Sequence, residues 1–204
     1  MKNISVLITT RQMPNPSPSI SIAYPEVLLP HLPVVQHSLN TQIRNELNQL
    51  LIDQNYYDPS LVELLVYFEI KTNERDLLSL TLVAYSFTGG AHGMTVVRPL
   101  TFDTQTGKKY SLHNLLGSKD FEEPISNHIR KKIEEWHVDL LDPPFTEIRR
   151  DQDFYLADNS LVIYFQLYEI TPYVWGFPYF PIALKDIEYL IPSESPLQRF
   201  LPFL

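Results

Sequence analysis

Two long runs of β-forming residues, joined by a short polar segment, constrain the fold of this 204-residue chain more than any other feature. The runs span residues 61–72 and 77–88, and the polar residues 73–76 separate them. Alternation in the first run places residues such as Leu64 and Val66 on one face of a strand. A connection of this length is typical of a β-hairpin. We therefore expect an antiparallel strand pair with one dry face.

A helix is predicted ahead of this hairpin, over about residues 34–53. Leu39, Ile43 and Leu47 recur there at the spacing that puts side chains on one side of a helix. Asn40 falls on the opposite, polar side. The pattern is typical of a helix that lies over a sheet.

The remaining elements are expected to be mostly strands joined by short turns. Their sequence favours an α+β fold in which helices back an antiparallel meander. The predicted elements are strands over 4–9, 20–27 and 94–102, a helix that begins near Glu122 or Glu123, a hairpin within 153–170 that turns at Asp158-Asn159, a strand over 182–184 and a short helix over 185–190.

Composition is that of a globular protein, with 44% hydrophobic and 20% charged residues. The net charge of −8 argues against a nucleic-acid partner, because phosphate binding needs clustered Lys and Arg, and it suits a basic protein partner. No apolar run is long enough to span a bilayer, and the apolar run near Met1 is too short for a signal peptide.

The glycine-rich segment 89–93 admits two interpretations. A phosphate-binding loop would need the GxGxxG or GxxxxGK spacing and a following helix, and neither pattern is present. A tight turn between two strands fits better, because glycine adopts positive φ without steric cost. His92, in the middle of the segment, is either exposed for binding or hydrogen-bonded within the loop.

Conventional catalytic and metal-binding patterns are missing from the sequence. There is no cysteine, no GxSxG motif and no HExxH motif among the six histidines, so we expect no catalytic residue, metal or cofactor. Glu63, Glu69 and Glu169 lie on or near predicted strands. A pair of these carboxylates brought together by the fold would support acid–base chemistry, and this alternative stays open.

An aromatic segment near the C-terminus is the best candidate for a binding surface. Residues 173–180 hold five aromatic side chains, interrupted by one glycine and one proline. Such a loop either caps the core or displays anchors for a partner. Together with His92, the predicted binding residues are Tyr173, Trp175, Phe177 and Tyr179.

The runs 85–117 and 153–184 resemble a bacterial domain family of unknown function. That family forms the extracellular part of lysozyme-sensing anti-sigma factors and the non-catalytic region of some peptidoglycan deacetylases. The most specific part of the resemblance is TGGAHG followed by LTFD-x-x-TG-x-x-Y. Residues 22–47 are similar to the companion module that commonly precedes the domain.

The resemblance implies two fused modules, an N-terminal companion over residues 1–90 and a second module over 91–204. It also implies a sensor-like binding domain without catalytic residues, with lysozyme or another component of the cell envelope as its partner, and an extracellular or envelope location. Two alternatives remain: a cell-wall glycan hydrolase that uses strand carboxylates, and an accessory structural domain.

Overall fold

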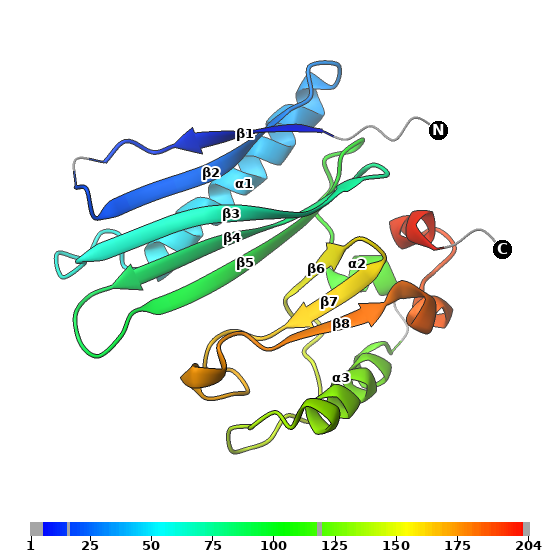
Figure 1. The fold of residues 1–204 in the computed structure, drawn as a ribbon. Coiled ribbons are helices and arrows are strands. Elements are labelled where there is room, and N and C mark those ends of the chain that lie inside the picture. Colours follow the sequence, from blue (N-terminus) through cyan, green and yellow to red (C-terminus); the bar gives the residue numbers. More distant parts are fainter. Residues whose placement is uncertain (1–5, 16, 118–119, 202–204) are drawn as a thin grey trace. The chain divides into compact units, whose positions relative to one another are not determined.

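The computed structural model describes residues 6–15, 17–117 and 120–201 (Figure 1). The chain divides into two compact units, Met1–Lys109 and Tyr110–Leu204, and each unit has its own sheet. The predicted module boundary between residues 90 and 91 falls in the turn between two paired strands. Because that pairing keeps both strands in one sheet, the compact units divide at a later position.

The first unit contains a five-stranded sheet in the order β1-β2-β3-β4-β5. The predicted hairpin is present, and the strand after it pairs back on the same side, so β3, β4 and β5 form an antiparallel meander. The expected strand over 4–9 lies partly outside the described residues. The strands are β1 (Leu7–Gln12), β2 (Ile20–Leu28), β3 (Glu63–Glu74), β4 (Leu77–Phe87) and β5 (Met94–Asp103).

The meander does not extend through the whole sheet, because β2 and β3 run parallel. Parallel neighbours cannot be joined by a tight turn, since the chain must return along the full length of the sheet. The helix α1 (Pro33–Asp53) makes this return, and its bounds agree with the predicted helix. The sheet is therefore mixed, and α1 is a crossover helix as well as a cover.

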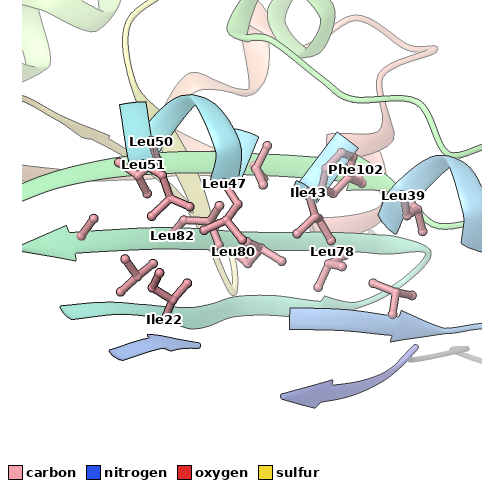
Figure 2. Packing of buried hydrophobic residues seen from close by; sticks show 14 of the residues in the cluster. Ile22, Leu39, Ile43, Leu47, Leu50, Leu51, Leu78, Leu80, Leu82 and Phe102 are labelled. Carbon is pink, nitrogen blue, oxygen red and sulfur yellow. The ribbon is translucent and has the colours of Figure 1, made fainter. Parts of the chain in front are cut away.

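The core of the first unit lies between α1 and one face of the sheet, as Figure 2 shows. Leucine and isoleucine side chains of the helix point toward side chains of the strands. Burying one such side chain contributes roughly 1.5–3 kcal/mol. The labelled core residues are Leu39, Ile43, Leu47, Leu50 and Leu51 of α1 and Ile22, Leu78, Leu80, Leu82 and Phe102 of the sheet.

Asn40 is buried, although the helical pattern assigned it to the polar face. Its Oδ1 accepts a hydrogen bond from the Val27 backbone N at 2.8 Å, and its Nδ2 donates to the Val27 carbonyl oxygen at 2.9 Å. The amide thus takes the place of a neighbouring strand for one residue of β2. Because both polar atoms of the Asn40 side chain form hydrogen bonds, these bonds offset the free-energy cost of removing the amide from water.

The second unit contains the three-stranded antiparallel sheet β6-β7-β8 and several short helices. The predicted hairpin turns at Asp158, which has a φ of 49°. The last strand begins earlier than predicted, and the helix after it is a 3₁₀ helix. The elements are α2 (Leu112–Leu116), α3 (Glu122–Trp136), β6 (Phe154–Ala157), β7 (Ser160–Tyr164), β8 (Tyr179–Ala183) and the 3₁₀ helices η1 (Tyr173–Trp175), η2 (Leu184–Leu190) and η3 (Pro196–Phe200).

An aromatic cluster forms much of the core of this second unit. The ring of Phe180 is fully buried and stacks on Trp136 of α3 at 5.8 Å between centroids. Phe165 packs edge-on against Phe180, also at 5.8 Å, and against Phe145 at 5.4 Å. Contacts of this geometry stabilise a core beyond simple area burial. They connect α3, the loop after it, the residue that follows β7, and β8.

The packing of α1 leads to a matched prediction. Leu47→Ala removes a side chain that is 1% exposed, and we expect it to lower the free energy of unfolding by about 2–5 kcal/mol through lost burial and a residual cavity. Val34→Ala, on the same helix but 81% exposed, should change it by less than about 0.5 kcal/mol. Urea unfolding followed by far-UV circular dichroism measures both. Equal effects would contradict the packing described.

Candidate functional site

The glycine segment is a turn, as predicted. It connects β4 and β5, and Gly89 and Gly90 have φ values of 98° and 101°, a region that residues with a Cβ rarely adopt. Gly93 serves a different purpose. A Cβ at this position would lie 2.3 Å from Cε2 of Tyr85 and 2.5 Å from the Ser86 carbonyl oxygen, so only glycine fits.

His92 is exposed and hydrogen-bonds within the loop. Its Nδ1 lies 2.9 Å from the Gly93 carbonyl oxygen, the distance of a hydrogen bond that a protonated Nδ1 donates. The ring lines a small hollow of about 130 Å³, together with Asn55, Ser86 and Met94 among others. The hollow is below the size of typical ligand sites, roughly 300 Å³ or more. The His92 ring therefore contributes to the conformation of the loop, and the hollow beside it is too small for a typical ligand site.

The two strand glutamates of the first unit do not form a catalytic pair. Glu63 and Glu69 lie six residues apart on β3, which is about 20 Å at the rise of an extended strand. Glycosidase carboxylates are about 5–9.5 Å apart. Glu69 accepts a hydrogen bond from Lys71 Nζ at 2.8 Å. Burial raises the pKa of Tyr67, and the charge of Glu69 raises it further. Tyr67 is thus no better a proton donor at neutral pH than an ordinary tyrosine.

Glu169, in the second unit, stabilises the chain after β7. One carboxylate oxygen pairs with the guanidinium of Arg149, and the other accepts from the Gln166 backbone N at 2.7 Å. Burial lowers the pKa of Arg149, but the hydrogen bond and charge of Glu169, with Asp151 and Asp153, outweigh it, so that the pKa is raised. These contacts give Glu169 a structural role.

The aromatic segment projects from the second unit as η1 and the residues around it (Figure 1). The Trp175 Nε1 donates to Asp139 Oδ2 at 3.3 Å, and Tyr173 packs on Tyr168 at 5.6 Å between centroids. A backbone hydrogen bond of 2.9 Å from Leu141 N to the Ile170 carbonyl oxygen holds the segment after α3 beside the segment that precedes η1.

Several of these side chains are exposed despite being large and apolar. Val174 is 89% exposed, Tyr168 is 45% exposed and Trp175 is 38% exposed. The acidic side chains of Asp139 and Asp142 are exposed in the adjoining segment. We call this set the aromatic–acidic surface; it consists of Asp139, Asp142, Tyr168, Tyr173, Val174 and Trp175.

The other predicted binding residues lie outside this surface. Phe177 is half-buried and packs against Tyr179 at 6.2 Å, and Tyr179 packs in turn against Tyr164 of β7 at 5.5 Å. His92 belongs to the first unit. The predicted set therefore divides into Tyr173 and Trp175 in the aromatic–acidic surface, Phe177 and Tyr179 beside the sheet, and His92 in the other unit. Tyr179 is as exposed as Trp175, at 38%.

Four members of this surface were not predicted from the sequence: Asp139, Asp142, Tyr168 and Val174. Val174 lies inside the aromatic run but is aliphatic, and Asp139 is 36 residues from its partner Trp175. Tyr168 was assigned to a strand, whereas the strand ends at Tyr164 and Tyr168 has a φ of 64°. Tyr168 packs on Tyr173 from a backbone with positive φ, a conformation that no local pattern predicts for a tyrosine.

Charge is distributed unequally between the two units. Residues 110–204 contain 8 of the 16 Lys and Arg residues but 15 of the 24 Asp and Glu residues, a formal charge of −7. Residues 1–109 carry the remaining −1. The acidity that the composition indicates is therefore a property of the unit that bears the aromatic–acidic surface.

The structure gives two further findings on metal ligands and membrane spans. Over residues 6–15, 17–117 and 120–201, no three His, Asp or Glu side chains lie close enough to hold a metal ion together. Within the same ranges, no helix has the length and apolar character needed to cross a bilayer.

Comparison with known families confirms the resemblance seen in the sequence. Residues 114–185, in the second unit, match the family described as protein of unknown function DUF3298. Residues 14–95, in the first unit, match the family described as deacetylase PdaC. The chain thus combines two regions similar to these families, the PdaC-like region first and the DUF3298-like region second.

One curated relative and two solved structures are also similar to this chain. The anti-sigma-V factor RsiV of Bacillus subtilis strain 168 is 29% identical over 62% of this chain. The chain spans about half of that relative's length, 48%. Two solved structures share the fold: a DUF3298 family member from Bacteroides fragilis (15% identity, 98% of this chain and 99% of that one, TM-score 0.72) and a DUF3298 family protein from Pseudomonas aeruginosa (17%, 98% and 96%, 0.67).

The glycine loop provides a prediction that separates fold from function. Gly93→Ala should lower the free energy of unfolding by about 1–3 kcal/mol, because the added methyl group overlaps Tyr85 and the Ser86 backbone. His92→Ala removes an exposed ring and should change it by about 0.5 kcal/mol or less. Thermal unfolding measures both variants. A larger loss for His92→Ala would show that the ring, rather than the glycine, fixes the loop.

Proposed function

We propose that the second unit is a non-enzymatic binding module for a basic protein of the cell envelope, with lysozyme as the first candidate. The observation that carries this proposal is the aromatic–acidic surface, which combines exposed apolar side chains with a unit of formal charge −7. Proteins rarely leave such side chains together in water without a partner to cover them.

The two kinds of side chain have separate roles in binding. Trp175 and Tyr173 are residue types that contribute strongly to interfaces, because they bury a large area at a small cost in conformational entropy. The carboxylates of Asp139 and Asp142 and the charge of the whole unit attract a basic protein and orient its approach. Trp175 also donates to Asp139, so the ring is held in place before the partner arrives.

The similarity to an anti-sigma factor supports a sensor-like role at the cell envelope. The resemblance seen in the sequence implies lysozyme as the ligand and an extracellular location. Because the chain covers about half of that relative, signalling through a sigma factor is not included in the proposal. The hydrolase alternative is disfavoured by the spacing of Glu63 and Glu69 and by the ion pair of Glu169.

Calorimetric titration of the full chain with hen egg-white lysozyme tests the proposal. We expect saturable binding at low salt that weakens at 0.5 M NaCl, because the screening length then falls well below its value of about 10 Å at 0.1 M. Trp175→Ala should weaken the complex by about 2 kcal/mol, roughly 30-fold. Val174→Lys should also weaken it, because it adds a cation at a side chain that is 89% exposed.

Tyr189→Ala is the matched control for these variants. Tyr189 is 64% exposed in the same unit but belongs to η2, outside the aromatic–acidic surface. Its removal should leave lysozyme affinity unchanged. The proposal fails if lysozyme does not bind at low salt, or if the three variants weaken binding equally.

A further inference from the structure

Two hollows with shared lining residues lie along α3 in the second unit, and neither is lined by residues of the aromatic–acidic surface. The larger has a volume of about 380 Å³ and is lined by Pro124, Asn127, His128, Lys131 and Tyr189. A smaller one of about 210 Å³ shares His128 and Lys131 and extends toward β8 and η2. The larger hollow is within the range of ligand sites, roughly 300–1,000 Å³.

The polar groups of the larger hollow include hydrogen-bond donors that the chain does not use. In the part of the chain that the structure describes, the His128 imidazole and the Tyr189 hydroxyl make no hydrogen bond or ion pair with another residue. Lys131 has an ion pair with Glu135 at 3.8 Å, and its side chain is 76% exposed. An exposed pair of this length contributes little, so Lys131 can turn to a ligand.

The charge of the hollow favours an anion. None of its five lining residues is acidic, and Lys131 supplies a positive charge. Glu135 and Asp186 line the smaller hollow instead. At the edge of the larger hollow, Asn127 Nδ2 donates to Glu123 Oε1 at 3.2 Å, so one acidic side chain contacts a lining residue. The lining itself carries a positive charge in a unit of formal charge −7.

The shape and the aromatic rim favour a sugar as the carrier of that anionic group. Tyr189 is 64% exposed and lines the hollow together with Asn127, His128 and Lys131 of α3. A pyranose ring has an apolar C–H face that packs on such a ring and hydroxyl groups that bond to the polar residues. A carboxylate on the sugar would accept hydrogen bonds from Lys131 and from His128.

We propose that the larger hollow binds a saccharide that carries a carboxylate group. Lys131 and His128 hold the carboxylate, Tyr189 packs against the sugar ring and donates its hydroxyl, and Asn127 contacts the ring substituents. This site is separate from the protein-binding surface proposed above. The module thus has two ligands, a basic protein and an acidic glycan, at different places.

Glucuronate and glucose form a matched pair of probes, because they differ only in the carboxylate. In an NMR titration of the full chain, glucuronate should shift the amide signals of residues 124–131 and 189 in a saturable way. Glucose should bind at least about tenfold more weakly, as expected for loss of charge-assisted hydrogen bonds. Lys131→Ala should produce a similar loss for glucuronate, and Tyr189→Phe, which keeps the ring, a smaller one.

Lys185→Ala controls for the general loss of an exposed positive charge in the same unit, and it should leave glucuronate affinity unchanged. Equal affinities for glucose and glucuronate overturn the proposal, as does inorganic phosphate binding as tightly as glucuronate. Trp175→Ala should leave glucuronate binding intact. Failure at this site is therefore distinguishable from failure of the lysozyme proposal.

Discussion

The burial of one aromatic ring, Phe180, is the interaction on which the second unit and its binding surface depend. Phe180 of β8 stacks on Trp136 and meets Phe165 edge-on, so it connects the helix α3, the strand β8 and the residue that follows β7. A three-stranded sheet of four or five residues per strand has little stability alone. The ring joins the buried side chains of Leu161, Ile163 and Tyr164 and links them to the helix that covers the sheet.

Strand alternation explains why the same segment can also display side chains. In β8 the neighbouring residues Tyr179 and Phe180 point to opposite sides, so one is 38% exposed and the other fully buried. The proline and glycine just before the strand end this alternation and allow η1 to project. Phe180 therefore caps the core, as one of the two interpretations made from the sequence has it. The role of Trp175 as a binding anchor is our proposal.

Local periodicity was enough to predict the hairpins and the helices α1 and α3. It was not enough for the parallel pairing of β2 with β3, because partners that are far apart in sequence leave no mark on a local pattern. Asn40 was assigned to the wrong face for a related reason. A helical pattern counts it as polar, whereas its burial depends on the Val27 backbone groups that it satisfies.

The sequence predicted two aromatic residues of the candidate site, Tyr173 and Trp175, but not the residues that surround them. The sequence indicates that residues 173–180 are unusual, yet the acidic partner Asp139 and the additional ring of Tyr168 come from segments that only the fold brings close. The charge of −7 in the second unit is readable from the sequence once the division between units is known. Folding thus places acidic residues of this unit, such as Asp139, beside the aromatic segment.

Hydrogen–deuterium exchange of the full chain with saturating lysozyme tests the central claim most directly, because it locates the contact without any substitution. The account predicts slower exchange over residues 138–143 and 168–176, and unchanged exchange in the glycine loop 89–93. Protection confined to the first unit, or no protection anywhere in the second unit, would contradict it.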